Sequence, residues 1–508
     1  MMKKIKLCIL LALLGTAMIS CLDKYPEDAI PAGDAITTVD DADQSMIGIY
    51  AAFKSSALYS GLLTLLPDLQ TDFVYQVEGS GNVYGNIWRW DILSTNSEIE
   101  SVYGTLYAII SRCNFLLDNI AEMQKTMTND DDLDKLESIC GEAYFARALC
   151  YSELIKLFCK SYESDEDAKN ELGVILSSHY NSTDPQIRAS LYDSYQFVLK
   201  DLDRVAELLD VDEDEVSQSD LYNTPYFNEY TAYALRARVA LYMKKYDEAV
   251  KYASKVIDSG FYVLSSAKTQ YGSTGQSYYQ YMWTMDDSTE TIWKIGFTNT
   301  SYGGALGTIF FNYDYVSIKP DYVPAEWVIN LYNESDLRVS TFFRSYTTGY
   351  SHGLTWPLLQ KYWGNTQLTQ YNILHVSMPK VFRLSEQYLI RAEAYAQLEQ
   401  PDYSKAGKDI TALREARYSS YGGSTTLNKD NAMEVIEEER VKELYMEGFR
   451  MQDLKRWHKG FERKPQSCTL SNGNSLKIEK DNPYFVWPIP QHDIEAPGSQ
   501  IQPNESNK

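Results

Sequence analysis

Apolar residues recur every three or four positions along most of the chain, and this spacing predicts α-helices. The helices expected in the first half cover about residues 40–58, 102–123, 137–158 and 192–209. Between about 263 and 379 the helical spacing is lost, and Gly, Ser, Asn and Thr are frequent, which is typical of loops, short strands and short helices. Helical spacing returns at about 380–460. The pattern predicts a mainly α-helical protein with one large irregular insert.

Two segments have the pattern of paired antiparallel helices. In the first, 226–259, small side chains lie on one face of each predicted helix, and Lys244 and Lys245 mark the turn between them. Small residues at these positions let two helices approach closely, as in a tetratricopeptide repeat of about 34 residues. A related unit covers 388–416. Because such pairs bury their faces only by stacking, we expect weaker repeats beside them, so that helical repeats cover about 40–262 and 380–460. Two unrelated Ala-rich hairpins are the alternative.

The first 21 residues have the pattern of an export signal. Three lysines precede the apolar segment Leu7–Ile19, which is too short to span a bilayer as a helix. Ser20 then stands directly before Cys21, as in bacterial lipoprotein signals, where the cysteine is lipidated and becomes the new N-terminus. We therefore expect a signal peptide at 1–20, a lipidated tether at 21–39, and a single body at 40–508 with a C-terminal tail at 461–508.

Charge and composition narrow the function. The formal net charge of −23 argues against nucleic acid and against a polybasic attachment to anionic lipid. The seven cysteines form no close CxxC pair, which excludes a dense disulfide scaffold. Aromatic residues make up 13% of the chain, with 41 tyrosines, and they are concentrated in the insert. The insert therefore has the composition of a binding surface.

Motifs for catalysis are missing from the sequence. The five histidines are scattered without HExxH or another metal-ligand spacing. Neither a GxSxG nucleophile elbow nor a GxxxxGK[ST] phosphate loop occurs. The glycines of 79–85 nearly match GxGxxG, but the third comes one place late and no βαβ pattern surrounds it. We predict a protein that is not an enzyme and has no cofactor or catalytic metal; the sequence leaves a structural calcium ion open.

Aromatic side chains in polar loops suit a sugar ligand. A sugar ring offers an apolar C–H face bounded by hydroxyls, so Trp and Tyr can cover the face while Asn and Arg bind the hydroxyls. Two regions compete for this role. The first is a Gly/Asn-rich loop with Asn82, Tyr84, Trp88 and Arg89. The second is the insert, with the candidates Tyr279, Trp283, Tyr302, Tyr313, Trp356 and Trp363.

Three segments of the C-terminal third resemble the SusD/RagB family of outer-membrane nutrient-binding lipoproteins. They are RLSEQYLIRAEA at 383–394, the charged run from Ile436 to Trp457, and PYFVWPIP at 483–490. The resemblance implies a helical repeat scaffold with a ligand surface on loops of the opposite side. It also implies a TonB-dependent SusC-like transporter as partner, with this protein as a lid over the barrel. Acidic and basic residues of the charged run recur at helical spacing, so we expect ion pairs there rather than catalysis.

These observations predict a lipid-anchored, cell-surface protein of the outer membrane. It would capture an oligo- or polysaccharide without covalent change and pass it to the SusC-like transporter. A peptide-binding uptake lipoprotein of the same fold is one alternative, because aromatic grooves also suit extended peptides. A pure interaction scaffold, with the aromatic residues in its core, is the other.

Overall fold

A computed structural model of the chain describes residues 35–181, 185–211 and 216–507. The expected signal peptide, Cys21 and most of the tether lie outside these residues. None of the described helices is both long and apolar enough to cross a membrane.

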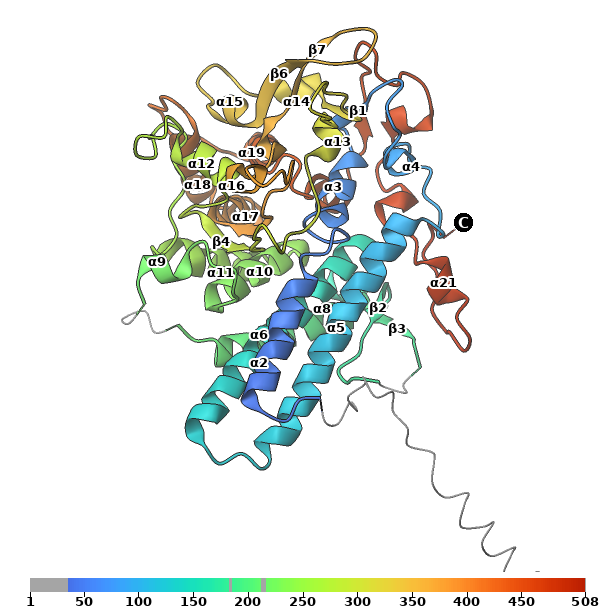
Figure 1. Cartoon of the computed structure of the whole chain (residues 1–508), viewed down its shortest axis with the longest axis vertical. Helices are drawn as coiled ribbons and strands as arrows, with labels where there is room; N and C mark the ends of the chain where they lie inside the picture. The colour runs from blue at the N-terminus through green and yellow to red at the C-terminus, as the bar shows by residue number, and fades with distance from the viewer. Residues whose placement is uncertain (1–34, 182–184, 212–215, 508) are drawn as a thin grey trace, which may run out of the picture.

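The long helices of the first half pack side by side (Figure 1). They are α2 (Val39–Ala52), α5 (Ser97–Gln124), α6 (Asp130–Phe158) and α8 (Leu191–Leu208). Each begins after a polar N-cap residue whose side chain accepts a hydrogen bond from a backbone N–H of the first turn, namely Thr38, Asn96, Asn129 and Ser190. The four helices predicted from apolar spacing are all present, although α2 ends at Ala52, earlier than predicted.

Both predicted helix pairs form. The first is α10 (Glu229–Tyr242) with α11 (Tyr246–Asp258), and the second is α17 (Leu384–Gln397) with α18 (Tyr403–Arg417). α11 packs against α17, so the two pairs stack as repeats do. The small side chains meet at this junction, in a cluster that includes Ala237, Ala240, Ala249, Ala253 and Ala394.

The charged run forms two helices rather than one. These are α19 (Ala432–Glu443), which packs against α17, and α20 (Arg450–Arg456). Between them Met446 and Gly448 have positive φ angles of 58° and 84°, which an α-helix does not allow. The expected ion pairs are present: Arg440 Nε donates to Asp453 at 2.8 Å across the break.

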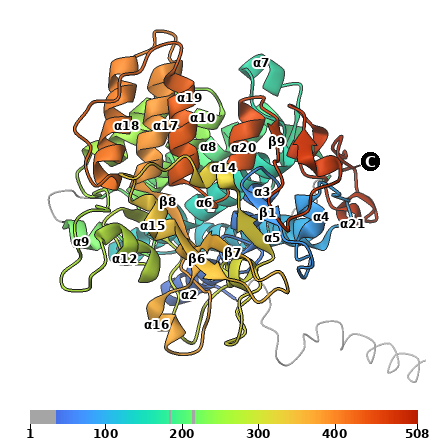
Figure 2. The same cartoon turned by 90° about the horizontal axis from the view of Figure 1, so that it is seen from above.

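The insert consists of short elements at one end of the molecule (Figures 1 and 2). They are α12 (Tyr278–Thr284), β4 (Thr291–Lys294), α13 (Thr308–Phe311), β5 (Tyr322–Pro324), α14 (Glu326–Ile329), α15 (Arg338–Phe342), β6 (Phe343–Thr347), β7 (Thr355–Leu359), η2 (Gln360–Tyr362) and α16 (Thr366–Thr369). All sheets are two-stranded and antiparallel in the described residues: β6 pairs with β7, β4 with β8 (Lys380–Arg383), and β1 (Val74–Gln76) with β5. The irregular insert predicted from sequence therefore consists of short elements, and it is joined to the scaffold by strand pairing at β4 and β5.

Short elements complete the scaffold and the tail. They are α3 (Leu62–Leu69), α4 (Gly85–Trp88), α7 (Asp165–Ala168), β2 (Leu172–Ile175), β3 (Arg188–Ser190), α9 (Gln218–Leu221), β9 (Phe461–Glu462), η3 (Asn474–Leu476), β10 (Lys477–Ile478), η4 (Pro483–Phe485) and α21 (Gln491–Ile494).

A buried charge network joins the insert to the scaffold. The Glu443 carboxylate accepts hydrogen bonds from Arg338 at 3.1 Å, Arg383 at 2.9 Å and Arg417 at 2.8 Å. Arg383 and Arg417 also donate to Glu290, at 2.7 and 2.9 Å. Burial alone would raise the pKa of Glu443, but the neighbouring guanidinium groups outweigh it and hold that pKa well below its usual range.

Candidate functional site

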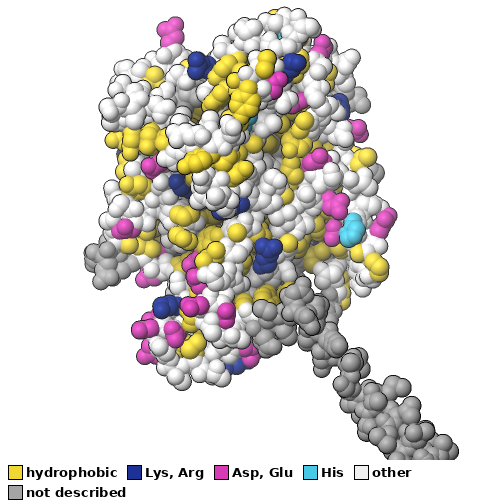
Figure 3. Space-filling model, viewed as in Figure 1, with side chains coloured by type: hydrophobic (Ala, Val, Ile, Leu, Met, Phe, Trp, Pro, Cys, Tyr) yellow, Lys and Arg dark blue, Asp and Glu magenta, His cyan; other side chains and the backbone are white. Residues whose placement is uncertain are grey.

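Four aromatic side chains of the insert meet at the surface: Tyr313, Tyr315, Tyr346 and Trp363, here named the Trp363 patch. The rings of Tyr346 and Trp363 are stacked, with centroids 5.8 Å apart and an interplanar angle of 3°. Tyr313 lies 5.9 Å from Trp363 and 5.5 Å from Tyr315. Tyr315 is 60% exposed and the other three are half-buried. Figure 3 shows hydrophobic side chains, a class that includes tyrosine, at the end of the molecule that carries β6 and β7 and also over the middle of this face.

Local structure explains how these rings come together. Tyr346 lies on β6 and shares a strand face with Arg344, two residues before it, because strand side chains alternate. Arg344 lies 5.6 Å above the ring of Tyr346. Trp363 follows η2 directly. Tyr313 is paired with Ile318 in a short hairpin that projects Tyr315 outward.

A buried histidine supports the patch from within. His375 is 4% exposed, stacks on Phe311 at 5.3 Å, and lies edge-on to Trp363 at 5.5 Å. Its Nδ1 is 3.1 Å from the carbonyl oxygen of Trp363, so Nδ1 carries the proton and donates. Nε2 is buried and has no hydrogen-bond partner within the protein. Burial lowers the pKa of His375 from its usual 6.5, so the neutral ring is favoured.

Polar groups surround the rings. The hydroxyl of Tyr346 donates to Gln360 at 2.6 Å, and the hydroxyl of Tyr315 lies 3.4 Å from Asn372 Oδ1. Asp314 accepts backbone hydrogen bonds from Ser317 and Val316, which lower the pKa of its carboxyl and keep it ionised. Arg344, Asp314 and Asn372 are exposed. The patch therefore combines apolar ring faces with donors and acceptors at its edge.

Four of the aromatic residues predicted to face a ligand are buried, and the structure corrects their assignment. Trp88, Tyr279, Trp283 and Trp356 are at most 7% exposed. The indole of Trp88 donates to the carbonyl of Val74 at 2.9 Å, so this side chain holds α4 on β1. Large aromatic side chains bury the most apolar area, which is why they fill the core as readily as they form binding surfaces.

Tyr279 and Trp283 belong to the junction between insert and scaffold. The hydroxyl of Tyr279 donates to Glu443 at 3.3 Å, and Arg417 lies 4.0 Å above its ring. Lys361 and Lys380 lie 4.2 and 4.7 Å above Trp283. These cation–π contacts are those of an interior packed around paired charges.

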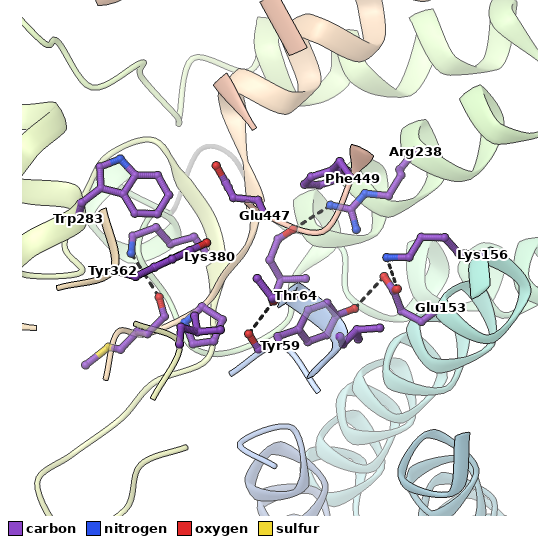
Figure 4. A pocket seen from close by; sticks show the side chains of 15 residues that line it. Tyr59, Thr64, Glu153, Lys156, Arg238, Trp283, Tyr362, Lys380, Glu447 and Phe449 are labelled. Atoms are coloured by element: carbon purple, nitrogen blue, oxygen red, sulfur yellow. Dashed lines mark hydrogen bonds and ion pairs between the residues drawn. The ribbon is translucent and has the colours of Figure 1, made fainter. Parts of the chain in front are cut away.

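Trp283 lines an interior cavity of about 40 Å³ (Figure 4). Its other walls include Tyr59, Glu153, Arg238 and Glu447. A buried water needs roughly 10–15 Å³, so this space has room for a few waters but is too small for a sugar ring. The cavity is not a ligand site.

The first predicted loop is structured by its own side chains. Asn82 Oδ1 accepts from Gln76 at 2.9 Å and from Arg89 at 2.6 Å. Arg89 is thus a partner of Asn82 rather than a free donor. Asn82 is exposed and Tyr84 half-buried, and both have positive φ angles, 58° and 55°. In the described residues, the side-chain hydrogen bonds of Asn82 and Arg89 stay within this loop and β1.

Of the ten predicted ligand residues, the structure brings Tyr313 and Trp363 together. Tyr302 is 47% exposed but makes no ring contact with the patch among the described residues. Sequence reasoning missed Tyr315, Tyr346 and His375. Arg344 and Tyr346 are two positions apart, a spacing that indicates one face of a strand and could have been used to find Tyr346. No local pattern could place His375 beside Trp363.

Residues 35–181, 185–211 and 216–507 contain no group of three His, Cys, Asp or Glu side chains placed to hold a metal ion. All five cysteines beyond Cys21 are free thiols.

The fold and the patch together describe a helical repeat protein with a candidate binding surface. A family model described as "SusD family" matches residues 148–505, and a second, described as "Starch-binding associating with outer membrane", matches residues 43–241. The chain belongs to the SusD family.

Known relatives agree with this assignment. "SusD-like protein P2" from Formosa agariphila is 25% identical over 158 residues, which are 31% of this chain and 30% of that protein. "SusD-like protein P25" of the same organism is 26% identical over 144 residues, 27% of this chain and 26% of that protein. The matched segments thus cover 30% and 26% of these two curated relatives.

Solved structures share the fold over nearly the whole chain. A SusD superfamily protein from Bacteroides thetaiotaomicron has a TM-score of 0.77 at 24% identity, covering 92% of this chain and 99% of that one. "Surface glycan-binding protein A" from Bacteroides fluxus has a TM-score of 0.66 at 18% identity, covering 92% of this chain and 100% of that one. The sequence-based prediction of a SusD-like helical scaffold is confirmed.

Proposed function

We propose that this protein binds an oligo- or polysaccharide at the Trp363 patch and releases it chemically unchanged. The observation that carries the proposal is the near-parallel stack of Tyr346 on Trp363 beside the exposed ring of Tyr315. Aromatic faces cover the C–H face of a sugar at little cost in side-chain entropy, and Arg344, Asp314 and Asn372 are suited to its hydroxyls.

The names of similar proteins support a glycan ligand. One matching family model is described as starch-binding and associated with the outer membrane. A "putative sugar binding protein" from Bacteroides vulgatus shares the fold with a TM-score of 0.75 at 24% identity, over 93% of this chain and 100% of that one.

The expected affinity follows from the geometry. The contact free energy of an open surface with two or three ring faces exceeds the entropy cost of association only modestly. We therefore expect a Kd near micromolar, which is a binding free energy of about −8 kcal/mol. Many copies on one cell surface would hold a polymer with much higher avidity.

Native affinity electrophoresis against a panel of plant, host and microbial polysaccharides tests the proposal. Retardation by one polymer, followed by isothermal titration with its oligosaccharides, should show a loss of at least about tenfold for Trp363→Ala and a smaller loss for Tyr315→Ala. Tyr226→Ala is the matched control, because this tyrosine is 59% exposed and its ring packs edge-on against Tyr50, outside the patch.

Two results would overturn the glycan proposal. If no polysaccharide retards the protein while peptides from a casein digest bind it, the ligand class is peptide. If a glycan binds but the Trp363 and Tyr315 variants bind it as tightly as the native protein does, the site lies elsewhere.

We further propose that the protein is anchored to the outer membrane by lipid on Cys21, exposed at the cell surface, and delivers its ligand to a SusC-like TonB-dependent transporter. The sequence Ser20–Cys21 supports the anchor, and family membership supports the partner. Replacement of Cys21 by Ala should release the protein from the membrane fraction, and affinity purification from native membranes should recover the transporter.

A further inference from the structure

A second group of tyrosines lies on the insert, outside the Trp363 patch. Tyr271, Tyr278 and Tyr281, here named the Tyr278 patch, belong to α12 and to the short hairpin that precedes it. The rings of Tyr271 and Tyr281 are stacked, with centroids 3.9 Å apart and an interplanar angle of 15°. The ring of Tyr278 lies edge-on to Tyr271 at 5.1 Å. Tyr278 is 38% exposed and the other two are half-buried, so the group presents ring surface to solvent.

Local hydrogen bonds hold these rings in place. The backbone N–H of Tyr271 donates to the carbonyl of Gln276 at 2.8 Å, which closes the hairpin. The side chain of Gln276 accepts from the hydroxyl of Thr284 at 2.9 Å, which fixes the hairpin on the end of α12. Tyr278 and Tyr281 are three residues apart on α12 and share a helix face, onto which the hairpin folds Tyr271. The rings are therefore ordered in the free protein, so little side-chain entropy is lost when a ligand binds.

The surroundings of these rings are polar but uncharged. Residues 272–275 are Gly, Ser, Thr and Gly, and all four are exposed. The whole segment 269–281 contains no Asp, Glu, Lys or Arg. Ring faces bordered by hydroxyl groups suit a sugar, and a segment without charge suits a sugar without charge.

Two hydrogen bonds connect the Tyr278 patch to the Trp363 patch through α16. Asn365, the N-cap of α16, donates to Asp286 at 2.8 Å, and Asp286 comes two residues after α12. Three residues after α16, the Oδ1 atom of Asn372 lies 3.4 Å from the hydroxyl of Tyr315, which belongs to the Trp363 patch. Figure 2 shows α16 at the edge of the molecule, between α12 and β6 in this view. α16 thus lies between the two patches.

Tyr371 is an exposed ring on this connection. It follows α16, where its backbone N–H donates to the carbonyl of Leu368 at 2.9 Å, and it is 62% exposed. It stands directly before Asn372, which contacts the Trp363 patch. Tyr371 therefore offers a further ring face between the two patches.

We propose that the Trp363 patch is one end of a longer binding surface, and that its occupant is an extended, uncharged polysaccharide chain. The chain runs from the Trp363 patch over Tyr371 to the Tyr278 patch. This proposal rests on glycan binding at the Trp363 patch and adds the length and the charge class of the ligand. The formal net charge of −23 further disfavours a polyanionic chain.

The two patches together should favour long chains over short ones. A chain held at the Trp363 patch meets the Tyr278 patch at a high effective concentration, so a weak second contact still tightens binding. A short fragment reaches one patch only. Affinity should therefore rise about three- to tenfold once fragments are long enough to reach the second patch.

Native affinity electrophoresis of the full chain in detergent identifies the polymer. The probes are soluble starch, xyloglucan and yeast mannan, which are neutral, and pectin and hyaluronan, which are acidic. A neutral polymer should retard the protein, and the acidic ones should not. Partial hydrolysis of the retarding polymer gives a ladder of chain lengths for titration calorimetry.

Tyr278→Ala is the decisive variant. It should weaken the binding of long fragments about three- to tenfold and leave that of short fragments unchanged, whereas Trp363→Ala should weaken both. Tyr180→Ala is the matched control, because this tyrosine is also 38% exposed and lies edge-on to Phe115 at 4.9 Å, on the scaffold. Melting temperatures separate lost binding from lost folding. Should Tyr278→Ala melt early, Tyr371→Ala provides the same comparison of long with short fragments.

Three results would exclude the longer surface and leave glycan binding at the Trp363 patch intact. One is equal binding of long fragments by Tyr278→Ala and the native protein while Trp363→Ala loses them. Another is an equal loss in Tyr180→Ala, and the third is retardation by an acidic polymer alone. If no polymer of the panel retards the protein, glycan binding at the Trp363 patch and the longer surface are both refuted.

Discussion

The ring of Tyr346 lies parallel to that of Trp363, within 3°, although the two residues belong to different elements of the insert. The hydroxyl of Tyr346 is fixed by Gln360, and the backbone of Trp363 is fixed by His375. Both rings are therefore ordered before any ligand arrives, so little side-chain entropy is lost when a ligand binds.

Tyr346 stacks on Trp363 with its ring and donates to Gln360 with its hydroxyl, and two replacements should separate these roles. Tyr346→Ala removes the stacked ring and should weaken glycan binding about tenfold, because Trp363 loses the neighbour that orients it. Tyr346→Phe keeps the stack and loses the bond to Gln360, so binding should fall by no more than about threefold. Titration calorimetry measures both, and equal losses in the two variants would contradict a stacking role.

Trp88 should be a core residue in solution. Trp88→Ala removes a fully buried ring and the 4.1 Å contact with the Arg463 guanidinium, so the free energy of unfolding should fall by about 3–5 kcal/mol. Leu93→Ala, at a nearby side chain that is 54% exposed, should cost less than about 0.5 kcal/mol. Urea denaturation followed by circular dichroism compares them. A Trp88 variant of native stability that loses the ligand would reverse the assignment.

Glu443 should be essential to the junction between insert and scaffold. Glu443→Gln leaves three buried guanidinium groups without their shared carboxylate, and the free energy of unfolding should fall by about 3–5 kcal/mol. Glu438→Gln is the control on the same helix. It is 39% exposed and pairs with Lys442, so its loss should cost at most about 1 kcal/mol. Similar chemical denaturation curves for the two variants would disprove the network's importance.

Acid should destabilise the patch through His375. Burial lowers the pKa of this histidine below its usual 6.5, so in the range just below pH 6.5 the unfolded chain binds a proton that the folded chain does not. Stability therefore falls as the pH drops from 6.5 through the folded pKa. The melting temperature should drop more between pH 7.5 and 5.5 in the native protein than in His375→Gln.

The exposed His492 provides the control for this measurement. His492→Gln should keep the pH dependence of the native protein. If His375→Gln keeps it too, then His375 does not carry the effect.

Helical elements could be predicted from sequence because the signal is local. The spacing of Ala237, Ala240, Ala249 and Ala253 predicts the buried faces of α10 and α11, and those residues do form the junction of the repeats. The break within the charged run could not be predicted in this way. It depends on positive φ angles at Met446 and Gly448, and Arg450, directly after the break, pairs with Asp72, which is far away in the chain.

The exposure of the aromatic residues, unlike the helices, could not be predicted from sequence. Composition located them in the insert, but Trp283 and Trp363 have similar polar surroundings in sequence, and one is in the core while the other is at the surface. Their burial depends on contacts with distant residues, such as Lys380 above Trp283 and Tyr346 on Trp363.

The sequence by itself determined the helical scaffold, the paired repeats, the irregular insert and the motifs that mark the SusD family, because periodicity and motif spacing are properties of neighbouring residues. Only the tertiary structure decided which rings form the Trp363 patch and which, such as that of Trp283, lie in the core. Whether a side chain is exposed or buried is settled by segments far away in the chain, and no local pattern records those contacts.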